Sequence, residues 1–179
     1  MSSKNVYLGN NIYNKAKTEI EGDFVEIGGE QFYKISNYNQ MDDFFISIIS
    51  NSDHWMFISS NGALTAGRKN RDNALFPYYT EDKIHDYKGI NGAITYLIIE
   101  LEGKDFLWEP FSDEHKHIYS IERNIYKSFY GNKIIFEEIN HDLQINFKYA
   151  WYNSEKFGFI KKSCITNLSD STRKFTILD

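Results

Sequence analysis

The feature that most constrains this chain is a two-residue alternation of apolar and polar side chains. It is clearest between residues 143 and 151, where one set is apolar and the intervening set is polar. The apolar set is Leu143, Ile145, Phe147, Tyr149 and Trp151, and the polar set is Gln144, Asn146 and Lys148. Because successive side chains of a β-strand point to opposite faces, this pattern predicts a strand with one buried face.

Similar short runs recur from Asp23 to Leu178, and turn signals separate them. Gly28-Gly29 and Asn61-Gly62 are typical of tight turns between antiparallel strands. Spacings near the ~8–12 residues of antiparallel architectures predict an all-β fold, an antiparallel two-sheet β-sandwich, over a single domain of residues 1–179. The expected helices are few and short, at Asn14–Ile20 and at Thr80–His85, with Thr80 as the N-cap.

Composition excludes several classes of function. The net charge of −5 comes without a basic stripe, which argues against binding to nucleic acid. No apolar run approaches the ~20 residues needed to cross a bilayer, so no membrane span is expected. The N-terminus lacks the apolar region of a signal peptide, so we expect a cytoplasmic protein. The single cysteine, Cys164, lies in a strand-like run and is expected to be a buried, inert thiol.

The candidate binding segment is Gly67–Asp86, a polar and aromatic stretch that interrupts the strand pattern. Loops longer than ~12–15 residues in compact domains are usually functional or disordered, and the aromatic residues here favour an ordered loop. Its basic residues could bind a phosphate or carboxylate group, and its tyrosines could stack on a sugar ring. Its acidic residues and histidine could act as acid, base or hydrogen-bonding groups. The candidate ligand-binding residues are Arg68, Lys69, Arg71, Tyr78, Tyr79, Asp82, His85 and Asp86. The alternative is that this loop docks on another domain or subunit.

Other titratable residues give weaker signals. His115 and His117 have a metal-like spacing, but one local cluster without a distant partner indicates a solvated turn. His141 is expected in a hairpin turn, and the adjacent Glu137 and Glu138 should point to opposite faces of a strand. With no recognised catalytic motif, we predict no catalytic residue, no metal site and no cofactor within this chain.

The C-terminal segments, taken in order, resemble a known family. They are Asn140–Leu143, Phe147–Trp151, Ser154–Lys162, Thr166–Ser169 and Arg173–Asp179. This succession resembles the N-terminal β-sandwich, or supersandwich, domain of cellobiose-phosphorylase-like carbohydrate-active enzymes. The match covers roughly the last forty residues well and the earlier strands only by pattern.

The resemblance implies a galactose-mutarotase-like sandwich followed by an (α/α) barrel that carries the catalytic carboxylate. In such enzymes the sandwich mediates dimer contacts and lends loops to the rim of the active site. By that resemblance Gly67–Asp86 is the candidate rim or docking loop, although no family motif maps onto it residue by residue. The implied partners are an oligosaccharide or sugar phosphate, the downstream barrel and a second copy of the chain. A strand-like C-terminus adds the expectation that the chain is the N-terminal part of a longer enzyme.

Three functions therefore stay open. The leading hypothesis is a non-catalytic N-terminal domain of a bacterial glycoside phosphorylase or hydrolase, which supports the barrel, dimerisation and one wall of the substrate cleft. The second is a stand-alone carbohydrate-binding module that stacks sugars on Trp55, Trp108, Tyr78 or Tyr79. The third is an aldose-epimerase-like sandwich enzyme using His85 or His141 with a carboxylate.

Overall fold

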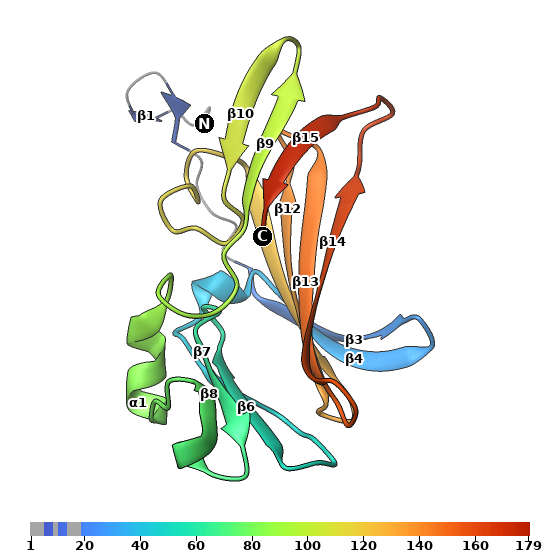
Figure 1. Ribbon diagram of the computed structural model, residues 1–179. Coiled ribbons are helices and arrows are strands. Elements are labelled where there is room, and N and C mark those ends of the chain that lie inside the picture. The colour runs from blue at the N-terminus through green and yellow to red at the C-terminus, as the bar shows by residue number, and fades with distance from the viewer. Residues whose placement is uncertain (1–5, 9–10, 14–18) are drawn as a thin grey trace.

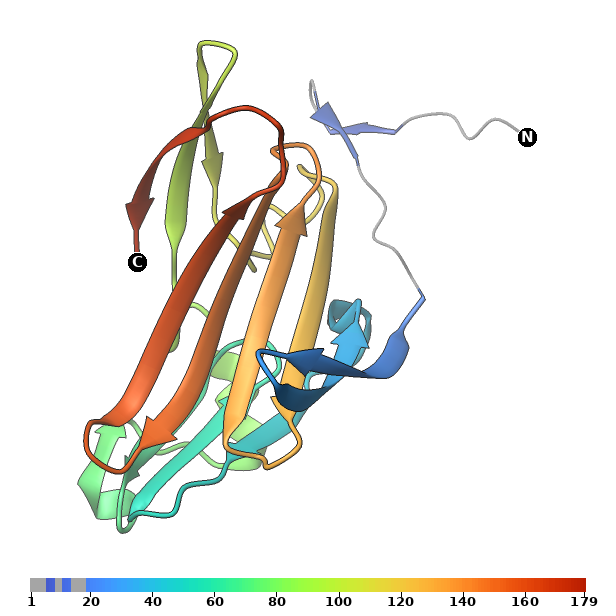
Figure 2. The ribbon, with the colours of Figure 1, turned by 90° about the vertical axis from the view of Figure 1, so that its right-hand side faces the viewer.

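The molecule is a layered antiparallel β-structure, as the alternation predicted. The computed structural model describes residues 6–8, 11–13 and 19–179, with 52% of residues in strands and 8% in helices. One layer is a six-stranded sheet in the order β14-β13-β12-β11-β4-β3 (Figures 1 and 2). Its strands are β3 (Glu21–Ile27), β4 (Glu30–Ser36), β11 (Ile121–Ser128), β12 (Lys133–Asn140), β13 (Ile145–Ser154) and β14 (Gly158–Asn167).

The second layer consists of two smaller sheets set one above the other along the long strands (Figure 1). The four-stranded sheet comprises β5 (Phe45–Ile48), β6 (His54–Ser59), β7 (Leu64–Arg68) and β8 (Ala74–Phe76). The three-stranded sheet has the order β10 (Lys104–Trp108), β9 (Tyr96–Leu101) and β15 (Lys174–Leu178). A two-stranded ladder pairs β1 (Tyr7–Leu8) with β2 (Asn11–Ile12).

The helices are short and lie in the connections. Among the described residues, the α-helix is α1 (Glu81–Ile84), and the 3₁₀ turns are η1 (Tyr38–Gln40), η2 (Arg71–Asn73) and η3 (His85–Tyr87). Thr80 occupies the N-cap position of α1, as predicted. The other expected helix, Asn14–Ile20, falls largely outside the described residues. Within the described ranges no helix is long and apolar enough to cross a membrane.

The core lies between the two layers and uses the predicted face of β13. Ile145, Phe147, Tyr149 and Trp151 of β13 are buried, and so is Leu143, which lies in the turn before the strand. They join side chains from both small sheets in one cluster, including Met56, Ile58, Leu64, Leu97, Ile99 and Trp108. Two small sheets are thus held on one large sheet by a single continuous apolar layer, the arrangement expected of a sandwich.

Both predicted hairpin turns are present. Gly28 and Gly29 have positive φ angles of 59° and 80° between β3 and β4, a conformation that glycine adopts without steric cost. Gly62, with φ of 95°, lies in the turn from β6 to β7. In the same turn, Asn61 Oδ1 accepts a hydrogen bond from the Ala63 N–H at 3.1 Å.

Two sequence-based expectations are corrected here. Cys164 is exposed, because its side chain points away from the core on the edge strand β14. Gly67–Asp86 is not one long ordered loop, since besides the expected helix, α1, it contains the end of β7, the 3₁₀ turn η2 and strand β8. The short β8 was missed because Ala74–Phe76 is too brief to show alternation.

Two adjacent glutamates on β12, Glu137 and Glu138, point to opposite faces, as predicted, and both are buried. On the core side, Glu138 accepts hydrogen bonds from Arg123 Nε at 2.6 Å, Trp108 Nε1 at 2.9 Å and the Phe111 N–H at 2.7 Å. On the other face, Glu137 accepts from Asn124, Tyr126, Asn146 and Lys148. Buried charges persist only when they are paired and hydrogen-bonded, and both carboxylates meet that condition.

Replacing Glu138 by Gln should destabilise the fold by about 3–5 kcal/mol, because the buried guanidinium of Arg123 loses its charged partner. The free energy of urea unfolding measures the loss. Glu26→Gln, at an exposed site on β3, is the control and should change stability by less than about 0.5 kcal/mol. A Glu138→Gln protein as stable as the control would contradict this role.

Glu137 should make the fold sensitive to acid. Burial alone would raise the pKa of Glu137, but hydrogen bonds led by Lys148 and Tyr126 outweigh it and lower the pKa. The stabilisation is therefore complete above the ordinary glutamate pKa of about 4.3 and is lost as pH falls through the lowered folded value. Unfolding free energies from pH 7 to pH 3 should fall more steeply for the wild type than for Glu137→Gln, and parallel slopes would refute the assignment.

Candidate functional site

The break between the two small sheets forms a cleft, which we call the junction cleft. Its walls come from the β6–β7 turn at Asn61, the segment after η3 at Lys88 and the β10–β11 connection at Asp113. Two adjoining cavities of about 290 and 360 Å³ open here, and both are lined by Asn61, Lys88, Phe111 and Asp113. Elements far apart in the sequence therefore meet where the second layer is interrupted.

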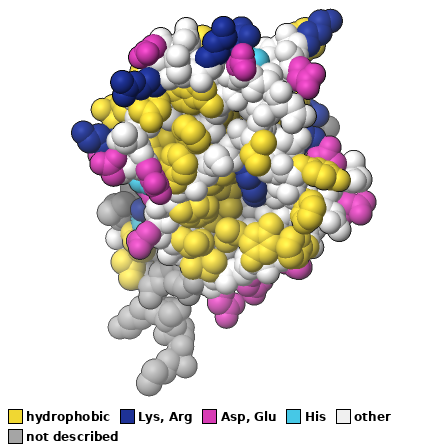
Figure 3. Space-filling view, turned by 90° about the horizontal axis from the view of Figure 1, so that it is seen from below, with side chains coloured by type: hydrophobic (Ala, Val, Ile, Leu, Met, Phe, Trp, Pro, Cys, Tyr) yellow, Lys and Arg dark blue, Asp and Glu magenta, His cyan; other side chains and the backbone are white. Residues whose placement is uncertain are grey.

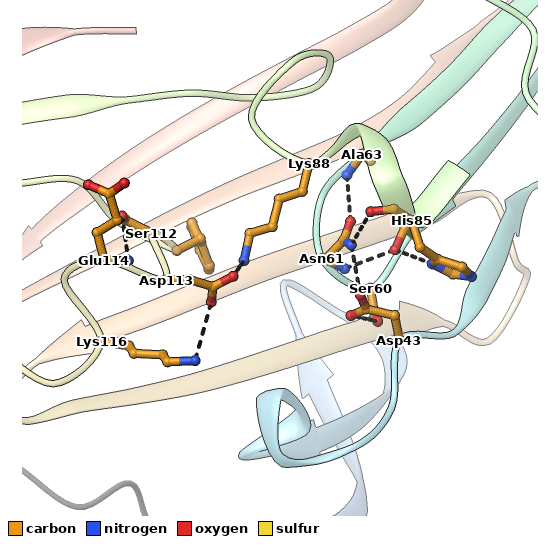
Figure 4. Close-up of polar contacts among 12 residues, drawn as sticks. Asp43, Ser60, Asn61, Ala63, His85, Lys88, Ser112, Asp113, Glu114 and Lys116 are labelled. Carbon is orange, nitrogen blue, oxygen red and sulfur yellow. Dashed lines mark hydrogen bonds and ion pairs between the residues drawn. The ribbon is translucent and has the colours of Figure 1, made fainter. Parts of the chain in front are cut away.

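An ion pair crosses this cleft. Lys88 Nζ lies 2.7 Å from Asp113 Oδ2, and the two side chains point toward one another from opposite walls (Figure 4). Arg123 Nη1 at 3.6 Å and Lys116 Nζ at 4.0 Å add positive charge around the same carboxylate. Partial burial alone would raise the pKa of Asp113, but the bond from Lys88 and the neighbouring cations lower it. Asp113 is therefore an ionised hydrogen-bond acceptor at neutral pH.

The opposite wall is fixed by the amide of Asn61. Its Nδ2 donates to Asp43 Oδ2 at 2.8 Å and to the backbone oxygen of His85 at 3.0 Å (Figure 4). Ser60 Oγ also donates to Asp43, at 3.4 Å. Because these contacts come from three separate segments, they hold the Asp43 carboxylate and the Asn61 amide in defined orientations.

Phe111 supplies an aromatic surface to the cleft. Its φ of 66° is in the left-handed region, which a bulky residue adopts at a cost of order 1–3 kcal/mol. Glu138 holds this conformation by accepting the Phe111 N–H, and the ring packs edge-on against Tyr149 with centroids 5.2 Å apart. Strain of this kind persists where surrounding contacts fix it, and it is concentrated at functional sites.

The cleft offers the carboxylates of Asp43 and Asp113, the amide of Asn61 and the ammonium group of Lys88 beside the ring of Phe111. Such a set can donate and accept several hydrogen bonds to a polyhydroxylated ligand. Its acidic lining, which includes Asp42, Asp43 and Asp113, disfavours an anion. In the described part of the chain, no group of three or more His, Cys, Asp or Glu residues is placed to hold a metal ion.

The candidate residues of Gly67–Asp86 do not form one site. His85 reaches the junction cleft only through its backbone oxygen, because its ring Nδ1 lies 2.8 Å from Ser59 Oγ. Asp82 and Asp86 are exposed near α1, and a hydrogen bond from Thr80 lowers the pKa of Asp82.

The basic candidates lie at the other end of the four-stranded sheet. Arg68 ends β7 and lines a separate cavity. Lys69 and Arg71 are exposed in the following turn, where Arg71 Nε lies 3.8 Å from Asp72.

The aromatic candidates have three different environments. Trp108 is fully buried, so it is a core residue and the prediction that it could stack a sugar is wrong. Tyr79 stacks on Tyr87 with centroids 3.6 Å apart. Trp55 and Tyr78 pack edge-to-face at 5.8 Å on the outer face of the four-stranded sheet, opposite the buried Met56.

Trp55 and Tyr78 continue into a longer series on that face. Trp55 packs on Phe57 at 5.8 Å and Phe57 packs on Phe45 at 5.1 Å. We call these four residues, Phe45, Phe57, Trp55 and Tyr78, the aromatic row.

His115, His117 and His141 do not line the junction cleft. His115 Nδ1 lies 3.3 Å from the Glu109 N–H, and the ring of His117 stacks on Tyr13 at 4.4 Å. His141 follows β12 in a turn, as predicted, with Nε2 at 3.9 Å from Glu122. The structure thus places His85 in η3 and His141 in the turn after β12, in separate environments.

Sequence reasoning missed Asp43, Lys88 and Asp113 as site residues. Among the residues of the cleft, only Asn61 was indicated by a local sequence pattern, the Asn61-Gly62 dipeptide that predicts a turn. The others stand in irregular segments, and nothing in their spacing indicates that the break in the second layer brings them together.

Comparisons with known proteins do not assign the chain to a family. No model of a protein family matches the chain, and a search of curated proteins also finds no match.

The Lys88–Asp113 pair can be tested by titration. Replacing Lys88 by Met should move the pKa of Asp113 upward, because the principal cation lowering it is removed. Carboxyl chemical shifts followed by NMR between pH 2 and pH 6 report this value. Lys104→Met, at an exposed site on β10, is the control, and a midpoint unchanged by Lys88→Met would contradict the ion pair.

Proposed function

We propose that this chain is a non-catalytic, carbohydrate-binding β-sandwich domain of a cytoplasmic glycoside phosphorylase- or hydrolase-like enzyme. In that enzyme it supports an (α/α) catalytic barrel and forms one wall of the substrate cleft. The observation that carries the proposal is the junction cleft, with Asn61, Lys88 and Asp113 beside Phe111. Its ligand is a neutral oligosaccharide.

The arrangement of polar groups favours binding over bond cleavage. Asp113 is held ionised by its cations, so it is a poor proton donor near neutral pH. Asp43 is engaged by Asn61 and Ser60. A glycosidase needs one carboxylic acid with a raised pKa facing a second carboxylate, and the lowered pKa of Asp113 does not suit it to be that acid. Sugar hydroxyls, in contrast, can use ionised acceptors and fixed amides directly.

Exposed apolar side chains support a bracing and dimerisation role for the three-stranded sheet. Tyr96, Ile98, Leu107 and Leu178 lie on the face turned away from the core, each at least 39% exposed. The register places Ile98 beside Leu107 and Tyr96 beside Leu178, so they form one surface. Contiguous apolar surface of this kind favours contact with another domain or subunit.

The aromatic row favours a second candidate function, that of a stand-alone carbohydrate-binding module. Its rings follow one another on an outer sheet face, where sugar rings could stack in series. Tyr78, at 46% exposed, is its most accessible described member. This candidate needs no contribution from the junction cleft.

Titration of the chain with cellobiose and cellotetraose by calorimetry tests the two candidates together. Lys88→Met should weaken binding at least fivefold, because it removes a donor from the cleft, whereas Tyr78→Ala should leave binding within twofold. The reverse pattern would assign binding to the aromatic row. No heat with either sugar, under conditions where the protein is folded, would refute both.

A further inference from the structure

A separate cavity opens at the end of the sandwich opposite the three-stranded sheet. It has a volume of about 670 Å³ and lies between the lower ends of β6, β7 and β8 and the β13–β14 hairpin. Figure 3 views the molecule from this end and shows hydrophobic side chains gathered around a hollow, with basic side chains inside it and at the rim. We call this cavity the end pocket.

The walls of the end pocket are aromatic and well ordered by packing. Phe76 packs edge-on against Trp151 with centroids 6.5 Å apart, and Phe159 packs edge-on against His54 at 5.2 Å. Trp151 is only 8% exposed, and its indole N–H is buried with no acceptor among the described residues. Phe157, at 73% exposed, stands at the rim. A ring-shaped ligand body would find apolar surface here.

The polar groups of the end pocket are mainly cationic. Arg68 and Lys156 have no carboxylate within ion-pair distance in the described part of the chain, and Lys156 Nζ lies 5.2 Å from the Phe157 ring centroid. Lys161 is already paired with Asp179 at 2.5 Å. Glu155 alone is acidic among the described lining residues. The pocket therefore has cationic groups available to an external anion.

His54 adds a directed polar group. Its Nδ1 lies 2.5 Å from Ser52 Oγ, which fixes the ring and leaves Nε2 on the side of Gly158. A methyl group at Gly158 would lie 3.4 Å from that Nε2, so the hairpin backbone passes close to the imidazole. Register places His54 opposite Arg68 on β6 and β7, which puts the imidazole and the guanidinium at one sheet end.

We propose that the end pocket binds a phosphate monoester carried on a ring, that is, a phosphorylated sugar. The phosphate oxygens accept hydrogen bonds from the guanidinium of Arg68 and from Lys156 and His54. The sugar ring lies against Phe76 and Trp151. This goes beyond the proposed function, because the junction cleft is acidic and takes a neutral ligand. Inorganic phosphate shares the anion chemistry but lacks the ring.

Calorimetric titration of the full chain with glucose 1-phosphate, inorganic phosphate and glucose tests the proposal. Glucose 1-phosphate should bind at least tenfold more tightly than inorganic phosphate, and glucose should not compete for it. Arg68→Ala should weaken glucose 1-phosphate binding about tenfold or more, as expected for loss of a charge-assisted contact. Arg68 is exposed at the end of β7, so this variant should fold normally.

Two controls separate this site from its surroundings and from the proposed function. Arg71→Ala, at an exposed arginine outside the pocket, should leave the affinity unchanged. Lys88→Met should weaken oligosaccharide binding without altering glucose 1-phosphate binding. Equal losses for Arg68→Ala and Arg71→Ala would indicate diffuse attraction and overturn the proposal. Inorganic phosphate binding as tightly as the ester, or no binding of either, would also overturn it.

Discussion

The buried ion pair between Arg123 and Glu138 is the interaction on which the second layer depends. Both side chains are at most 4% exposed, so neither charge could remain at this position alone. Through the same carboxylate, Glu138 binds the indole of Trp108 on β10 and the backbone of Phe111 just beyond it. One residue of the large sheet thereby fixes where the three-stranded sheet ends and how the chain leaves it.

That attachment also explains why the structure contains a cleft. Two short sheets cover the long strands less completely than one sheet would, and the gap between them must be closed without exposing the core. Phe111 closes it from one side in a strained conformation, and the Lys88–Asp113 pair crosses it above. A partly exposed ion pair contributes little stability by itself, so this pair can rearrange around a ligand at small cost. The cleft thus combines a rigid base with an adaptable rim.

The fold could be predicted from sequence because the alternation is a local property. Strand β13 and the turn at Asn61-Gly62 follow from neighbouring residues, and the structure confirms both. Whether a given side chain is buried or exposed could not be predicted in the same way. Trp108 is buried because it packs in the core cluster between the layers, where Glu138 accepts its N–H. Cys164 is exposed because its side chain points away from that core. Both facts depend on how the sheets pack together. The cleft depends on a gap between sheets, which no local pattern encodes.

The same two strands connect the junction cleft with the end pocket. β6 begins at His54 and leads to the turn at Asn61, and β7 returns to Arg68, so the two sites lie at opposite ends of one hairpin. Six strand residues span about 20 Å, roughly twice the Debye length at physiological salt. The acidic cleft and the basic pocket therefore have little electrostatic influence on each other. Each can select its own ligand by charge, and any coupling between them must pass through packing along the hairpin.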